Sequence, residues 1–274
     1  MQSEKRVLVT GGGTFVGDAI ASALLAEGAE VTLLVRPGRE EHLGLLADRV
    51  QWRTADVWEP SSLKGRARGQ QVVIHTVGSL TAEPGRGLTH HYLNFVSTRN
   101  VANMCISGGV PHLIFLSAAS ALWINREYLH AKREAEEYLF RVGLKATIIR
   151  APLLYARGGR RSLFHRLMSV LGVPPLGWLG GRRVAPMPVD VFARGVARLA
   201  MEPPPNKDIV YAGDLRRRNS RREVREGYYA VYVEPPAPDM PTPPSRPGIE
   251  FPPVSPDDTP LGWTPPTGRD DRER

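Results

Sequence analysis

A tyrosine and a lysine spaced four residues apart are the most informative chemical pair in this sequence. Tyr128 and Lys132 lie in a segment of helical periodicity, in which residues i and i+4 share one face. In 274 residues with eight tyrosines, about 0.15 such pairs would arise by chance. We therefore take this pair as the feature that separates an enzyme from a protein that only binds a ligand.

A second candidate site is a glycine-rich loop near the start of the chain. It lies between an apolar strand pattern and a helical pattern, where backbone N–H groups and the helix N-terminus can cradle a pyrophosphate. The same string outside a strand–helix junction would be weak evidence. The residues expected to contact a dinucleotide are Thr10, Gly11, Gly13, Thr14, Phe15, Val16 and Gly17.

The end of the second predicted strand bears on which dinucleotide would bind. Sites for NAD usually place an acidic residue here, next to the ribose hydroxyls. This chain has Val35 at that position, followed by Arg36 and, nearby, Arg39. A guanidinium suits a 2′-phosphate, so NADP(H) is favoured over NAD(H). The alternative is that Arg36 is an ordinary solvated loop arginine.

Apolar runs alternate with helical patterns as far as about residue 155, which predicts an α/β fold: a doubly wound parallel Rossmann sheet. Helices are expected directly after the first strand and over residues 88–106, 126–142, 161–171 and 189–201. The predicted strands are Arg6–Thr10, Glu30–Val35, Val50–Arg53, Val72–Thr76, His112–Ser117, Ala146–Arg150 and Asp208–Ala212.

These motifs resemble those of the atypical and extended short-chain dehydrogenases/reductases over residues 5–212. The loop resembles the pattern TGxxGxxG, with Gly11 and Gly17 at the first and third glycines and Thr14 replacing the middle one. A related GGTRFIG form occurs among atypical members. Within the family, the sequence is most similar to NmrA-like proteins and to the nucleotide-binding accessory subunit of mitochondrial complex I. Further matching segments are Asp56-Val57, Val72–Gly78, Asn94–Val101, Thr147–Ala156 and Pro186–Ala193.

The resemblance implies roles for individual residues. Lys132 would hold the nicotinamide ribose and lower the pKa of Tyr128, which would then act as general acid or base. Ser117, or alternatively Ser120, would hold the substrate carbonyl. Asp56 would contact the adenine amine, and the remaining cofactor contacts would come from Val57, Thr76, Val77, Gly78 and Pro152. No metal site is assigned. Two alternatives stay open: Ser117 only caps a strand, and the Tyr–Lys pair is preserved but idle.

The composition changes sharply towards the C-terminus. Residues 216–225 hold six arginines, and 13 of the 25 prolines lie between residues 234 and 266. Such a stretch favours an extended or disordered segment that orders on a partner. We therefore divide the chain into a dinucleotide-binding domain (1–155), a small substrate-side lobe (156–213) and an Arg-rich then Pro-rich extended tail (214–274).

Three functions fit these features. The first is an NADP-dependent oxidoreductase acting on a small carbonyl or hydroxyl substrate. The second is a non-catalytic nucleotide-binding subunit, tethered by its tail to a larger, membrane-associated complex. The third is a redox sensor or nucleic-acid binder, which rests on the net charge of +8 and is the weakest of the three. One cysteine and the lack of a recognisable secretion signal favour a cytoplasmic location.

Overall fold

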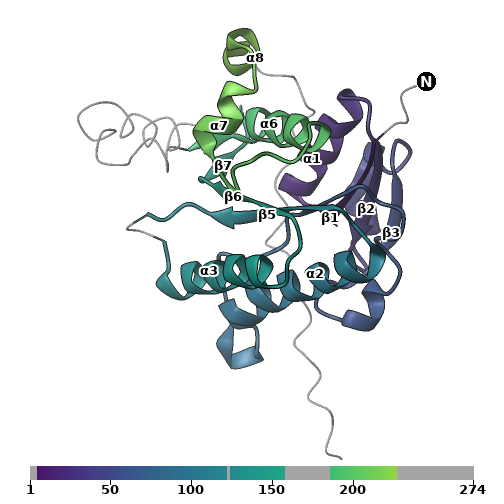
Figure 1. Cartoon of the computed structure of the whole chain (residues 1–274), viewed down its shortest axis with the longest axis vertical. Coiled ribbons are helices and arrows are strands. Elements are labelled where there is room, and N and C mark those ends of the chain that lie inside the picture. The colour runs from purple at the N-terminus through teal and green to yellow at the C-terminus, as the bar shows by residue number, and fades with distance from the viewer. Residues whose placement is uncertain (1–4, 122–123, 158–185, 227–274) are drawn as a thin grey trace, which may run out of the picture. The chain divides into compact units, whose positions relative to one another are not determined.

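Seven parallel strands form the central sheet of this protein. The computed structural model describes residues 5–121, 124–157 and 186–226 (Figure 1). The strand order is β3-β2-β1-β4-β5-β6-β9, so the chain starts in the middle and winds outward in both directions. The strands are β1 (Arg6–Gly12), β2 (Glu30–Val35), β3 (Gln51–Thr54), β4 (Val72–His75), β5 (His112–Ala118), β6 (Ala146–Ala151) and β9 (Ile209–Tyr211). The predicted Rossmann sheet is confirmed.

Helices cover both faces of the sheet, with α1 and α6 on one face and α2 and α3 on the other (Figure 1). Successive residues of β1 alternate between the two layers: Val7 and Val9 pack under α1 and α6, whereas Leu8 packs under α2. Both faces are therefore apolar, as a parallel sheet requires. The helices are α1 (Phe15–Ala26), α2 (Ser97–Gly108), α3 (Arg126–Arg141), α6 (Val189–Met201), α7 (Ala212–Arg217) and α8 (Arg221–Glu226).

Short segments complete the described chain. A π-helical turn precedes α2 directly, so the helix expected over residues 88–106 begins with a widened turn. Two short strands pair with each other outside the main sheet. The bounds are β7 (Leu154–Tyr155), β8 (Met187–Pro188), the π-helical turn His91–Val96 and the 3₁₀ segments Glu40–Leu46, Pro60–Leu63 and Pro84–Arg86.

The Arg-rich beginning of the expected extended tail is helical in the structure. Helices α7 and α8 occupy residues 212–217 and 221–226, because alanine, leucine and arginine are good helix formers and Leu215 is buried against α6. The expectation of an extended segment from residue 214 is therefore wrong for this part. The Pro-rich stretch beyond residue 226, and the helix expected over 161–171, lie outside the described residues.

Close packing of α6 on α7 generates a stability prediction. A Cβ added to Gly195 would lie 2.8 Å from both the Cβ and the carbonyl oxygen of Leu215. We expect Gly195→Ala to lower the free energy of unfolding by about 1–3 kcal/mol, because the two helices must separate. Gly213→Ala is the matched control, since nothing lies within 4 Å of its added Cβ. Equal denaturant midpoints for the two variants would contradict this packing.

Candidate active site at the carboxyl edge of the sheet

The sheet changes its winding direction between β1 and β4, and the residues predicted to do chemistry gather at the carboxyl ends of these and neighbouring strands. β2 continues the sheet from one side of β1, and β4 from the other. Ligands of open α/β sheets bind in the crevice at such a switch point. The glycine-rich loop follows β1, and Thr76, Val77 and Gly78 follow β4.

The glycine-rich loop is held tightly against the first helix. The Thr14 hydroxyl accepts a hydrogen bond from the Gly17 N–H at 3.2 Å and donates one to the Gly11 carbonyl oxygen at 2.6 Å, so Thr14 is the N-cap of α1. A Cβ on Gly17 would lie 2.1 Å from that carbonyl oxygen. Gly11 has a φ of 82°, which favours glycine. These are the roles that first and third glycines play in a dinucleotide loop, while Thr14 serves as a cap.

Asp18 contributes a carboxylate to this loop. Its Oδ1 accepts a hydrogen bond from the Gly13 N–H at 2.8 Å, so that amide is already bonded within the protein. Burial raises the pKa of Asp18 to about 7, although backbone hydrogen bonds from Gly13 and Thr14 oppose the shift. A group that carries full charge only above neutral pH therefore lies beside the N-terminus of α1.

The expected adenosine contacts flank the loop on the β2 side. Val35 is fully buried, and Arg36 is the first residue after β2. Asp56 follows β3, and its Oδ1 accepts a hydrogen bond from the Trp58 N–H at 2.9 Å. Val57 is buried, and its carbonyl oxygen accepts a hydrogen bond from Asn100 at 3.1 Å. The Asp56 side chain is thus held by a local contact, and the Val57 backbone is held by α2.

The segment after β4 joins the nucleotide loop to α3. The Thr76 hydroxyl donates a hydrogen bond to the Thr10 carbonyl oxygen at 2.5 Å, which ties the ends of β4 and β1 together. Two residues on, a Cβ added to Gly78 would lie 2.5 Å from Asn94 Oδ1 and 2.7 Å from Lys132 Nζ. Gly78, Asn94 and Lys132 therefore meet at one point, which only a glycine backbone permits.

Tyr128 and Lys132 are both deeply buried in α3. The Lys132 ammonium donates a hydrogen bond to the Leu116 carbonyl oxygen at 3.1 Å and lies over the Phe115 ring, 4.9 Å from its centroid. Burial lowers the pKa of Lys132 to about 7, against the opposing charge of Glu136. Burial also raises the pKa of Tyr128 to about 12, and the cation that counteracts this is Arg133. Desolvation thus outweighs the effect of neighbouring cations on Tyr128.

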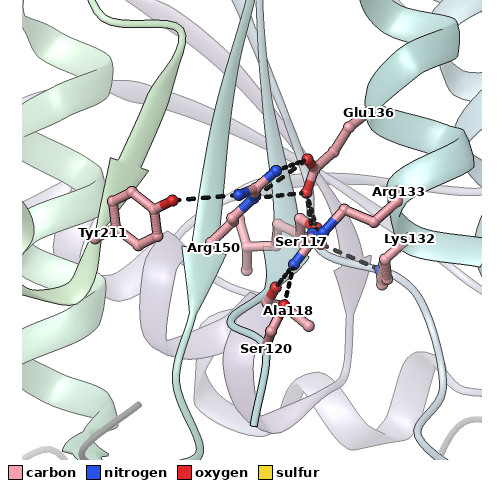
Figure 2. Close-up of polar contacts among 9 residues, drawn as sticks. Ser117, Ala118, Ser120, Lys132, Arg133, Glu136, Arg150 and Tyr211 are labelled. Carbon is pink, nitrogen blue, oxygen red and sulfur yellow. Dashed lines mark hydrogen bonds and ion pairs between the residues drawn. The ribbon is translucent and has the colours of Figure 1, made fainter. Parts of the chain in front are cut away.

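Ser117 belongs to a buried ionic cluster centred on Glu136 (Figure 2). Its hydroxyl donates a hydrogen bond to Glu136 Oε1 at 2.5 Å and accepts one from Arg133 at 3.1 Å. Glu136 also forms ion pairs with Arg133 and, at 2.6 Å, with Arg150. Ser120, the alternative to Ser117, accepts a hydrogen bond from Arg133 at 3.0 Å. Both serines therefore hold Arg133 in place.

A match to a known protein family identifies the class of protein to which this chain belongs. A family described as NAD(P)H-binding matches residues 11–165, which is more than half of the chain and includes the loop from Gly11 onward, the end of β4 and α3. The chain belongs to this NAD(P)H-binding family, within the atypical and extended short-chain dehydrogenases/reductases. A nicotinamide dinucleotide is accordingly its cofactor.

Relatives of this NAD(P)H-binding protein include two named oxidoreductases. Ceramide reductase of Caulobacter vibrioides is 27% identical over 57% of this chain and 49% of its own length. The decarboxylating sterol-4-alpha-carboxylate 3-dehydrogenase of Bos taurus is 29% identical over 43% and 32%. The chain thus spans half or less of these relatives. In fold it is similar to Bordetella bronchiseptica WbmH in complex with NAD+, with a TM-score of 0.53, 20% identity and 73% coverage of both chains.

The motif-based prediction does not include several residues of the candidate site. Asp18, His90, Arg133, Glu136 and Arg150 are engaged through contacts that no short motif encodes. Glu136 has one usable signal. It lies four residues after Lys132, on the face of α3 that otherwise presents small and apolar residues to the sheet. The charged pair Lys132 and Glu136 on the buried face of this amphipathic helix predicts a charged partner in the sheet, and that partner is Arg150.

Within the described residues, no helix is long and apolar enough to cross a membrane.

The raised pKa of Asp18 predicts a pH-dependent stability. Its ordinary pKa is 3.8 and its folded value about 7, so the folded chain holds a proton that the unfolded chain releases in between. The free energy of unfolding should therefore fall as pH rises from about 4 to 7, and Asp18→Asn should remove part of this slope. Denaturant unfolding at several pH values measures it. The exposed Asp48→Asn is the control, and identical slopes for both variants would contradict the assignment.

The Glu136 cluster predicts a large loss of stability on neutralisation. Glu136→Gln leaves Arg133 and Arg150 without their common anion, which should cost about 3–5 kcal/mol in the free energy of unfolding. The neighbouring Glu137 is exposed, so Glu137→Gln should stay within about 0.5 kcal/mol of wild type. Chemical denaturation of both variants compares them directly. A Glu136→Gln midpoint as high as that of Glu137→Gln would show that the cluster is not stabilising.

Proposed function

We propose that this protein is an NADP(H)-preferring oxidoreductase that interconverts a carbonyl and a hydroxyl group on a small substrate. The observation that carries the proposal is the placement of Lys132 against Gly78 and β5, one helical turn from Tyr128, with both side chains deeply buried. Two relatives are named a reductase and a dehydrogenase, which agrees with this reaction class. The preference for NADP(H) rests on Val35 in the place where an acidic residue would favour NAD(H), and on Arg36 directly after it.

The residues present fit a dinucleotide. Gly11 and Gly17 allow the tight turn and the close helix contact, and the N-terminus of α1 that follows the loop suits a pyrophosphate. The remaining expected contacts are Thr10, Gly13, Thr14, Phe15, Val16, Arg36, Asp56, Val57, Thr76, Val77, Gly78, Lys132 and Pro152. When bound, the nicotinamide supplies or accepts the hydride.

In this proposal the protein supplies the proton and the geometry. Tyr128 donates its phenolic proton to the carbonyl oxygen during reduction and takes it back during oxidation. Its pKa of about 12 keeps the phenol protonated at neutral pH, which suits the reductive direction. Lys132 holds the nicotinamide ribose from its fixed position on the Leu116 carbonyl oxygen. Burial of both side chains excludes water from the transfer.

The proposal is tested by NADPH oxidation on a panel of benzaldehyde, acetophenone, cyclohexanone and acetoacetate. We expect turnover with at least one compound and a loss of about 100-fold or more in kcat for Tyr128→Phe, because the proton donor is removed. NADPH should be preferred over NADH. Tyr138→Phe is the matched control, since its hydroxyl bonds Asn103 on the exposed face of α2 and α3. Unchanged turnover by Tyr128→Phe would overturn the proposal, and tight NADPH binding without turnover would favour a non-catalytic nucleotide-binding role.

A further inference from the structure

The contacts of Ser117 leave the substrate oxygen without an obvious hydrogen-bond donor. Its proton goes to Glu136 Oε1 and its lone pair faces Arg133, as Figure 2 shows. Turning the hydroxyl towards a substrate would take a hydrogen bond from a buried carboxylate, which is costly. Another side chain beside Tyr128 could hold the oxygen at lower cost, and the chain offers one.

His90 is that side chain. It is 6% exposed, and its ring packs edge-on against the Tyr128 ring, with centroids 5.9 Å apart and planes inclined by 67°. Its Nδ1 is buried and has no hydrogen-bond partner among the residues that the structure describes. A buried polar atom without a partner costs about 1–3 kcal/mol. Such a cost at the side of the candidate general acid indicates a group that acquires its partner from a ligand.

The backbone around His90 is fixed to the site. Its carbonyl oxygen accepts a hydrogen bond from the Asn94 side chain at 3.1 Å, and Asn94 also bonds both backbone polar groups of Ser79. Asn94 in turn lies against Gly78 beside Lys132. The π-helical turn begins at the next residue, so His90 stands at the joint between the β4 loop and α2. The backbone that carries the His90 ring is therefore fixed beside Gly78 and Lys132.

We propose that His90 is a catalytic residue, the hydrogen-bond donor that holds the substrate oxygen for Tyr128. The inference rests on the proposed oxidoreductase function and names the third member of its site. A neutral imidazole carries one N–H donor, which suits an uncharged carbonyl or hydroxyl oxygen. During reduction the carbonyl carbon receives the hydride and the oxygen receives the Tyr128 proton, while His90 keeps its own proton. Its bond strengthens as negative charge develops on that oxygen.

The test compares His90→Phe, which keeps a ring without nitrogen, with His90→Asn, which keeps a polar group near the Nδ1 position. With the panel compound that wild type reduces fastest, His90→Phe should lose about 100-fold or more in kcat, the usual effect of removing one oxyanion donor. His90→Asn should recover about tenfold of that loss. NADPH affinity, read by fluorescence, should stay unchanged in both variants, which shows that they are folded.

The neighbouring His91 gives the matched control. Its ring is exposed and pairs with Glu134 at 3.4 Å, so His91→Phe should keep wild-type turnover. The proposal is overturned if His90→Phe retains kcat within threefold of wild type, or if His90→Phe and His90→Asn lose the same amount. It is also overturned if Ser117→Ala loses about 100-fold while His90→Phe does not. Absence of turnover by wild type would remove the oxidoreductase function itself, whereas turnover that depends on Tyr128 but not on His90 would remove only this inference.

Discussion

A single buried carboxylate, that of Glu136, fixes the helix that carries the candidate chemistry. It joins α3 to the end of β5 through Ser117 and to β6 through Arg150, and Arg150 continues to Tyr211 at the end of β9. Because Glu136 is one helical turn from Lys132 and two from Tyr128, this anchor sets the height and rotation of both side chains. The cluster carries two arginines against one carboxylate, so its charge is not balanced within itself. Its excess positive charge lies at the carboxyl edge of the sheet, where a substrate would sit.

The glycine-rich loop and the Tyr128–Lys132 pair depend on different physical effects. On the nucleotide side, close contacts with backbone carbonyl oxygens dominate. Gly17 packs against the Gly11 carbonyl oxygen, and the Thr76 hydroxyl donates a hydrogen bond to the Thr10 carbonyl oxygen. On the chemical side, desolvation dominates, since it shifts the pKa of both Tyr128 and Lys132. Gly78 is where the halves meet, because a side chain there would displace Lys132 or Asn94. The position of the loop after β4 and that of the helix carrying Tyr128 and Lys132 therefore both depend on Gly78.

The local sequence pattern was sufficient to predict the strands of the sheet, but not the side-chain contacts of the candidate site. Apolar runs such as Glu30–Val35 locate strands directly, since a strand buried on both faces tolerates few polar residues. The prediction of an extended segment from residue 214 is wrong because it weighed the arginines and not Leu215, which with Ala212 packs α7 into the core. The motif and the family resemblance predict roles for Tyr128, Lys132 and Ser117. They do not predict that Ser117 bonds Glu136, which is paired with Arg150, 33 positions from Ser117 in sequence. No short pattern records such a contact, nor the approach of His90 to Tyr128.

Following deuterium from the nicotinamide to a carbonyl carbon tests the oxidoreductase function most directly. NADPH labelled at C4, on one face and then on the other, would be incubated with the protein and acetophenone or benzaldehyde, and the alcohol examined by NMR. We expect label from only one face of the nicotinamide to appear on the carbinol carbon, with the wild-type chain and not with Tyr128→Phe. Label that stays on NADPH bound by a folded wild-type chain, with every carbonyl compound offered, would contradict it.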